Sequence, residues 1–454
     1  MQFRTFIIAE IGAAIHVHNA MPTAKSTQPS PPHSLERLAP AFVTIVMLAA
    51  ILAPRATPWL LLLLGTSLIG LATGTGRSLD FLPLPGLAIG LGVLGGYLVV
   101  NALWAVDSIQ GMGRALLFIL IAGLVSTLRL ALPVLDSERV QMVQRAAMIG
   151  AGVGISFLAL ETVFDQPVRR LVISALPFLR PAAKHMTVTD GWVTHIGLYT
   201  LNRSLAMLVL LLWPLLLIVR AKLTAGQNRI AGIALLAVTA VTVFSSEHET
   251  SMLALVAGCI VFAGMAVAPK PTRSLVLAGW VAATLLVVPL AATAYDHGVH
   301  QAGWLPQTAR NRIVLWGVTA DKIWANPVLG IGIDSTKPLD DDAGPQAVVN
   351  PGDSYPQRTG RHAHNVFMQT WYELGAMGAL LLLGVGVLAL RALGRLPGAD
   401  QPYAIASFVS AMVIGAFSWG MWQPWFMAAF GFWAALLLIG LDATSRATRA
   451  GVEA

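Results

Sequence analysis

The sequence predicts an all-α protein that crosses a membrane about 12 times. Of its 454 residues, 56% are hydrophobic and only 11% are charged, whereas soluble domains carry about 25% charged residues. Apolar runs long enough to cross a bilayer as helices recur from one end of the chain to the other. The runs are continuous rather than alternating, which excludes a closed β-barrel.

The formal net charge of +7 comes from basic residues spread over many short loops. Because they form no stripe, we expect them to contact membrane lipid head groups and expect no nucleic-acid partner.

The chain divides into membrane-spanning and polar regions. We expect residues 1–38 to be a disordered N-terminal cytoplasmic tail, because much of this stretch is rich in Pro, Ser and Thr. Helices 1–9 are predicted within residues 39–295 and helices 10–12 within 365–441, with a large loop at 296–364 and a cytoplasmic tail at 442–454. The predicted spans are 39–54, 58–74, 84–104, 112–132, 141–164, 197–219, 228–244, 250–267, 274–295, 365–390, 402–421 and 424–441.

The orientation follows from Lys and Arg in the short loops, which are enriched on the cytoplasmic side. If the N-terminus is cytoplasmic, the short outer connections hold almost no basic residue beyond Arg55. We therefore expect both termini inside and the long loops 165–196 and 296–364 outside. The basic residues of the cytoplasmic connections are Arg77, Arg129, Arg139, Arg145, Arg220, Lys222, Arg229, Lys270, Arg273, Arg391, Arg395, Arg446 and Arg449.

The large loop contains a predicted amphipathic helix from Thr308 to Trp324, lying on the bilayer surface with Thr308 as its N-cap. Arg310 and Arg312 fall in its first turn, where cations oppose the helix dipole unless an anion is bound. Free backbone N–H groups together with guanidinium groups predict a phosphate-binding site there.

The stretch from Arg361 to Asn365 is where this loop meets the tenth span. Asn365 can cap the helix, and the helix dipole would lower the pKa of His364, so that a neutral imidazole could act as a general base. The alternative is a histidine that only caps the helix or lies at the lipid interface. We expect His362 to point elsewhere, and Arg361 to bind a head group or to lie on the loop surface.

Further polar residues support or surround this predicted site. Gln369 and Glu373 lie one turn apart and would order the His-bearing end or contact substrate, unless Glu373 is a buried structural residue paired with an arginine. Arg203 lies near the outer end of the sixth span and either binds an anion or snorkels. The acidic run at 340–342 is a metal site or a solvated loop face, and the Gly375/Gly378 pair is expected to permit close helix packing.

His364-Asn365, nine residues, then Gly375-Ala376-Met377-Gly378 resembles the His-Asn…Gly-x-x-Gly signature of the bacterial O-antigen ligase and polymerase family. Arg312 and Trp316, followed by Asn-Pro-Val-Leu-Gly-Ile-Gly at 326–332, resemble the preceding family segment. The resemblance covers most of residues 40–441.

This resemblance implies the all-helical membrane fold called GT-C, in the bacterial inner membrane. It implies transfer of a glycan from undecaprenyl pyrophosphate to a sugar hydroxyl of lipid A–core on the periplasmic face. His364 would act on the acceptor hydroxyl as base or orienting group. Arg203 and Arg312 would bind the pyrophosphate, with Arg310 and Arg361 as further contacts. The first outer loops lack the paired acidic motif of metal-dependent enzymes, so we expect neither a metal nor a cofactor.

One segment departs from the family pattern. At 245–251, where the resemblance implies an arginine, the chain has carboxylates and His248. One phosphate contact is therefore in doubt, or its role moves to Arg203.

Other activities remain open. A polymerase would use the same donor; we favour a ligase because Arg312 and His364 lie in one long loop, as in ligases. A protein O-oligosaccharyltransferase is disfavoured because the chain ends soon after the last span. A transporter or flippase for lipid-linked glycans predicts ionisable residues along a central path, with Glu161 as its critical residue.

Overall fold

The computed structural model describes residues 34–74, 85–342, 353 and 355–453. The described residues from Pro40 onward belong to one compact unit, which contains every candidate site residue. Nearly all of the predicted tail at 1–38 lies outside the described residues.

The protein is all-α and crosses the membrane many times, as predicted. Within the described residues, ten helices are long and apolar enough to span a bilayer, and two further apolar helices are shorter. The long helices are α3 (Thr57–Thr73), α4 (Gly86–Asn101), α5 (Ser108–Ala131), α6 (Ser137–Val163), α8 (Asn202–Lys222), α9 (Ala225–Phe244), α10 (Glu249–Val267), α11 (Pro269–Asp296), α14 (Val366–Leu393) and α16 (Pro424–Glu453), and the shorter ones are α2 (Ser34–Leu52) and α15 (Gln401–Phe417).

The remaining elements are short and lie in the connections. They are α7 (Pro167–Ala175), α12 (Gln307–Ile323), α13 (Thr336–Asp342), β1 (Met186–Thr189) and β2 (Trp192–Ile196), with 3-10 turns η1 (Pro54–Ala56), η2 (Ala102–Trp104), η3 (Leu132–Val134), η4 (Pro177–Leu179), η5 (Ala183–His185), η6 (Leu198–Leu201) and η7 (Val299–Gln301).

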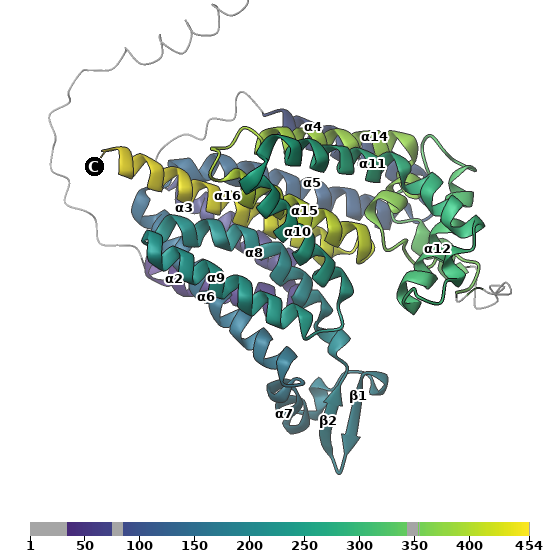
Figure 1. Ribbon diagram of the computed structural model, residues 1–454, viewed down its shortest axis with the longest axis horizontal. Coiled ribbons are helices and arrows are strands. Elements are labelled where there is room, and N and C mark those ends of the chain that lie inside the picture. Colours follow the sequence, from purple (N-terminus) through teal and green to yellow (C-terminus); the bar gives the residue numbers. More distant parts are fainter. Residues whose placement is uncertain (1–33, 75–84, 343–352, 354, 454) are drawn as a thin grey trace, which may run out of the picture. The chain divides into compact units, whose positions relative to one another are not determined.

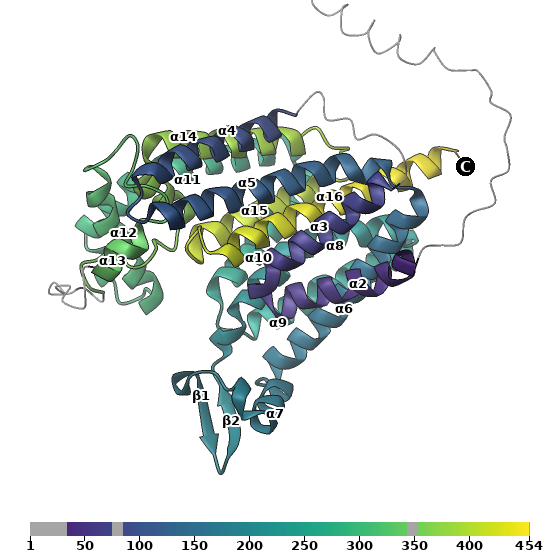
Figure 2. The ribbon, with the colours of Figure 1, turned by 180° about the vertical axis from the view of Figure 1, so that it is seen from behind.

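Helix α8 is the central helix of the bundle. Its sequence is apolar on every face from Leu205 to Val219, as expected for a helix surrounded by protein. Its apolar window is 89% buried, against 17% for α9 at the edge. It packs against α16, α15 and α9, and the bundle helices lie side by side in Figure 1 and Figure 2.

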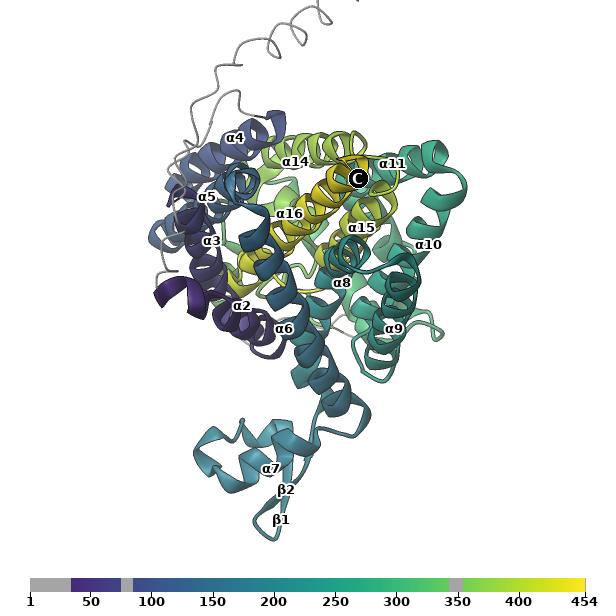
Figure 3. The same cartoon turned by 90° about the vertical axis from the view of Figure 1, so that its left-hand side faces the viewer.

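The loop at 165–196 folds into α7 and an antiparallel β1–β2 hairpin, which the sequence did not predict. Ile173, Val193 and Ile196 form a small hydrophobic core of their own. Figure 3 shows this module beside the helical bundle rather than within it. The buried Glu161 carboxylate accepts hydrogen bonds from the backbone N–H groups of Val168 and Arg169 at the start of α7.

Helix α14 is interrupted at Gly375, whose φ of 65° and ψ of −166° are not helical. The 327–332 segment docks into the break: Ala376 N–H donates to Pro327 O (2.8 Å), and Gly332 N–H donates to Glu373 O (2.9 Å). Backbone groups freed within a membrane span must be paired by protein, and this segment supplies the partners. The expectation that Gly375 serves ordinary helix packing is therefore wrong.

Two helix boundaries differ from the predicted ones near the site. Helix α15 ends at Phe417 and α16 begins at Pro424, so residues 418–423, partly assigned to the eleventh span, form a loop. Proline suits the first turn of a helix because its missing N–H is not needed there. Helix α16 also continues to Glu453, through residues predicted as a tail.

Candidate active site

Three segments that are far apart in the sequence meet at one end of the bundle. They are the 361–365 stretch before α14, the 418–423 loop before α16, and helix α12, which packs on α11 and α14. Helix α12 begins at Gln307 with Pro306 as N-cap. Thr308 is therefore not the cap; its hydroxyl donates to Glu249 Oε2 (3.0 Å), which ties α12 to the start of α10.

His364 has a defined tautomer. Its Nδ1 lies 2.5 Å from the carbonyl oxygen of Ser418, and a carbonyl oxygen only accepts hydrogen bonds. Nδ1 therefore carries the proton, and in the neutral ring Nε2 keeps a free lone pair. Burial lowers the pKa of His364, opposed by the Ser418 hydrogen bond and reinforced by the positive charge of Arg312. A neutral imidazole with a free Nε2 can accept a proton at neutral pH.

The backbone around His364 is held in place on both sides. His364 has a φ of 52°, which is uncommon for a non-glycine residue. Asn365 caps α14 as predicted, since its side chain accepts from Phe367 N (2.9 Å) and Met368 N (3.1 Å). On the other side, the Trp316 indole donates to Ala363 O (2.6 Å). These contacts maintain the left-handed conformation.

His362 lies against His364 rather than pointing elsewhere. The two ring centroids are 4.1 Å apart in an edge-to-face arrangement. Burial, followed by the charges of His364 and Arg361, lowers the pKa of His362 to about 3. Its Nδ1 is buried and has no hydrogen-bond partner among the described residues. Gly420 packs directly on this ring, where a Cβ would meet the His362 side chain at 2.8 Å.

Arg312 and Arg310 face different surroundings although both lie near the start of α12. Burial lowers the pKa of Arg312, opposed by the carboxylate of Glu249, and its charge acts on His364 and His248. We find no hydrogen bond or ion pair of Arg312 in the described part of the chain. Arg310 Nε instead donates to the backbone carbonyl of His300 (2.8 Å).

The 245–251 segment, which departs from the family pattern, borders this site. His248 stacks on Trp419 at 5.3 Å, and its Nδ1 lies 2.6 Å from Ser251 Oγ. Burial and the charge of Arg312 lower the pKa of His248 to about 4. His248 is therefore neutral at pH 7 and adds no positive charge where the resemblance implies an arginine.

Arg203 lies at the start of α8 with an unsatisfied charge. Its guanidinium carbon is 5.3 Å from the centroid of the Trp425 ring, and its Nε is buried without a partner. The charge of Arg55 acts on it, and no ion pair of Arg203 is found among the described residues. Trp425 in turn meets Trp419 edge to face at 4.8 Å, and Trp419 stacks on His248, so a chain of aromatic contacts links Arg203 to His248.

Glu373 and Gln369 connect the segments that form the site. The fully buried Glu373 carboxylate accepts from Thr336 N (3.0 Å), Thr336 Oγ1 (2.5 Å), Gln369 Nε2 (3.2 Å) and the Trp422 indole. Gln369 Oε1 accepts from Met421 N (3.1 Å). Glu373 is thus not paired with an arginine; it joins the 336 region, α14 and the 418–423 loop.

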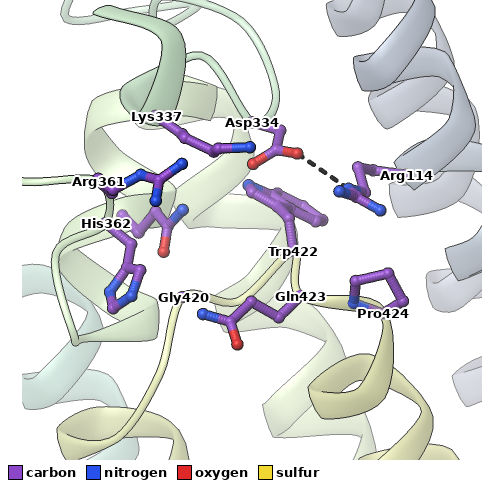
Figure 4. A pocket seen from close by; sticks show the side chains of 10 residues that line it. Arg114, Asp334, Lys337, Arg361, His362, Gly420, Trp422, Gln423 and Pro424 are labelled. Carbon is purple, nitrogen blue, oxygen red and sulfur yellow. Dashed lines mark hydrogen bonds and ion pairs between the residues drawn. The ribbon is translucent and has the colours of Figure 1, made fainter. Parts of the chain in front are cut away.

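Arg361 pairs with Asp341 on the surface (Nε to Oδ1, 3.2 Å) and lines a cavity next to His362 (Figure 4). Asp340, the buried first residue of the acidic run at 340–342, binds Arg358 instead. No group of three or more His, Cys, Asp or Glu able to hold a metal ion occurs among the described residues.

The sequence reasoning missed the 418–423 loop. Ser418 fixes the tautomer of His364, Trp419 stacks on His248, and Trp422 binds Glu373. The available signal was two tryptophans, a glycine and a following proline within seven residues at the end of an apolar run.

Comparisons with known proteins show what the chain is similar to. A family model described as O-antigen ligase matches residues 233–383, which include Arg312 and His364. The chain is therefore similar to the O-antigen ligase family over this segment. Proteins named "Putative polysaccharide ligase" from Rickettsia prowazekii and Rickettsia typhi are each 24% identical to it over 270 residues, 59% of this chain. The match spans 65% of the length of these relatives.

Proposed function

We propose that this protein is an O-antigen ligase. It transfers a glycan from undecaprenyl pyrophosphate to a sugar hydroxyl of lipid A–core. His364 is the general base, and Arg312 and Arg203 bind the pyrophosphate. The observation that carries the proposal is the hydrogen bond from His364 Nδ1 to Ser418 O, because it leaves Nε2 as the proton acceptor.

The proposed step is a displacement at the anomeric carbon of the donor sugar. The acceptor hydroxyl oxygen forms the new glycosidic bond while its proton passes to His364 Nε2. The bond between the anomeric carbon and the pyrophosphate oxygen breaks, and undecaprenyl pyrophosphate leaves with that electron pair. Cations placed where this negative charge develops stabilise the transition state.

Arg312 and Arg203 suit the pyrophosphate because neither has a carboxylate partner within salt-bridge distance among the described residues. Both residues are partly buried, and a partly buried cation without a counter-ion gains stability when a ligand supplies the negative charge. Arg310 is already bound to a backbone carbonyl, and Arg361 pairs with Asp341 and lines a cavity that neither Arg312 nor Arg203 lines. We therefore assign the pyrophosphate to Arg312 and Arg203 rather than to all four arginines.

The placement in the membrane follows from the basic residues of the short loops. Their distribution supports an inner-membrane protein with cytoplasmic termini and a site on the periplasmic face. A polymerase with the same donor is the alternative. The transporter alternative predicted that Glu161 would face a central transport path. The Glu161 carboxylate instead accepts hydrogen bonds at the start of α7, which disfavours this alternative.

The test uses the full-length protein in proteoliposomes with a glycan-loaded undecaprenyl pyrophosphate donor and lipid A–core. Loss of a general base typically lowers the rate by about 10²–10⁴-fold, and we expect a loss of this size for His364→Ala. The matched control is His297→Ala, because His297 Nδ1 also lies near a backbone carbonyl, Thr293 O (3.0 Å), but on the exposed end of α11. This control should keep full activity.

Three results would contradict parts of the proposal. Glycans that lengthen on the donor lipid instead of appearing on lipid A–core would identify a polymerase. Equal activity of His364→Ala and His297→Ala would remove His364 from the mechanism. Bound donor with no product of either kind would overturn glycan transfer itself.

A further inference from the structure

A cavity of about 290 Å³ lies beside His362 and has no role in the step described above. Its wall includes Arg114 from α5, Lys337 from α13, Arg361 and His362 from the stretch before α14, and Trp422 from the 418–423 loop. Figure 4 shows Lys337, Asp334 and Arg114 along one side and His362 along the other. Neither Arg312 nor Arg203 lines it.

The charge of the cavity wall is positive. It carries three cations, Arg114, Lys337 and Arg361, and one carboxylate, Asp334. Asp334 Oδ2 is bound to Arg114 Nε at 2.9 Å, so this pair is neutral as a unit. Lys337 and Arg361 supply the remaining positive charge.

These two cations are available to a ligand. Lys337 has no ion pair within 4 Å in the part of the chain that the structure describes. Arg361 pairs with Asp341, but the two side chains are 58% and 50% exposed, and an exposed ion pair of this kind contributes little. A ligand anion can therefore recruit both without breaking a strong interaction.

The rest of the wall fits a sugar. Polar amides from Gln369 and Gln423 lie beside the Trp422 ring, and small-molecule sites commonly combine aromatic surface with a few fixed polar groups. The Trp422 ring is fixed because its indole N–H binds Glu373. His362 adds a buried Nδ1 that has no partner among the described residues.

The cavity lies next to the proton acceptor, because the rings of His362 and His364 are 4.1 Å apart. We propose that it binds the acceptor, through a phosphate or carboxylate group on the acceptor sugar held by Lys337 and Arg361. This inference rests on the proposed function. In this arrangement Arg312 and Arg203 bind the donor pyrophosphate, Lys337 and Arg361 bind the acceptor anion, and His364 lies near both sites.

Two measurements on the full-length protein in detergent micelles or proteoliposomes test the proposal. The first is binding of soluble core oligosaccharide, either phosphorylated or treated with phosphatase. The second is the KM for each acceptor and for the donor. We expect Lys337→Gln to weaken binding of the phosphorylated oligosaccharide and to raise its KM about tenfold, as for the loss of one charge-assisted contact worth about 1.4 kcal/mol. The donor KM and the affinity for the dephosphorylated acceptor should stay unchanged.

The matched control is Lys322→Gln, an exposed lysine on α12 that does not line the cavity. Lys337→Arg should restore binding, since it keeps the charge. Equal binding by Lys337→Gln and Lys322→Gln, or a rise in the donor KM instead of the acceptor KM, would overturn the proposal. If the oligosaccharide binds in a charge-dependent way but no glycan is transferred, acceptor binding in the cavity is supported and the proposed function is contradicted. The two proposals can therefore fail separately.

Discussion

Gly330 and Gly375 meet backbone to backbone at the break in α14. A Cβ on Gly330 would overlap the Glu373 carbonyl group, and a Cβ on Gly375 would overlap that of Val328. Both residues also have positive φ, 71° and 65°. This contact fixes the register between the 327–332 segment and the helix that carries Gln369 and Glu373.

Gly375→Ala should therefore destabilise the protein. With φ of 65° and ψ of −166°, Gly375 lies in a backbone region that is open essentially to glycine alone. Another residue there costs roughly 1–3 kcal/mol, and the overlap with Val328 adds to this. The thermal unfolding temperature of the purified protein measures the effect. Gly384→Ala, in the same helix and facing open space, is the control and should not lower that temperature; equal losses would mean that the break at Gly375 does not exist.

The rate of glycan transfer should depend on pH through His364. Because burial lowers its pKa below the usual value of about 6.5, the neutral base persists in mildly acidic solution. We expect kcat/KM to remain constant down to about pH 6.5 and to fall only below that. If kcat/KM already fell to half of its maximum at a pH above the usual histidine pKa, His364 would not be a buried neutral base.

Stability should also fall in acid because two buried histidines are neutral in the folded protein. The pKa is lowered to about 3 for His362 and to about 4 for His248. Between these values and the unfolded pKa of about 6.5, the unfolded chain binds more protons, so the free energy of unfolding decreases as pH falls. Unfolding temperatures from pH 7 to pH 4 should decline less steeply for His362→Gln and His248→Gln than for the unaltered protein. Parallel curves would show that neither ring is buried in the neutral form.

Arg203 and Arg220 lie at opposite ends of α8, and their substitution by glutamine should have different effects on the unfolding temperature. Arg220 Nη1 binds Asp400 Oδ1 at 2.5 Å, whereas Arg203 has a buried Nε without a partner. Arg220→Gln should lower the unfolding temperature because Asp400 is left buried and unpaired. Arg203→Gln should leave that temperature unchanged or raise it, while raising the donor KM. A drop in stability for Arg203→Gln with unchanged donor KM would indicate a structural arginine.

Glu373→Ala should be among the most destabilising substitutions at the site. Its carboxylate accepts from Thr336, Gln369 and Trp422, and a buried donor left without a partner costs about 1–3 kcal/mol. We expect a lower unfolding temperature together with lost activity. Glu247→Ala is the control, since Glu247 is exposed; if the two variants unfold alike, the Glu373 network does not support the site.

The membrane helices could be predicted because burial in lipid requires long apolar runs, and α8 is an example: residues 197–219 were predicted and Asn202–Lys222 are helical. The interruption of α14 could not, because Gly375 is equally compatible with close helix packing. It depends on the 327–332 segment, which comes from a distant part of the chain. The hairpin had a signal in Asp190-Gly191, a dipeptide that favours tight β-turns, and both residues have positive φ.

The residues of the site that could be predicted are those whose roles are local. Asn365 caps the helix that follows it, and His364 precedes the same helix. The contact of Ser418 with His364 and the approach of Lys337 to His362 join segments separated along the chain, so no spacing in the sequence reveals them. Arg361 was expected to bind a head group or to lie on the loop surface, and its partner Asp341 could be identified only in three dimensions.

The module formed by α7 and the β1–β2 hairpin has a consequence for experiments on orientation. Its core is separate from that of the bundle, and Gly191 at the hairpin tip faces open space. An epitope inserted between Asp190 and Gly191 should therefore be tolerated without disturbing His364. Antibody labelling of spheroplasts before and after permeabilisation would then report directly which side of the membrane carries the long loops.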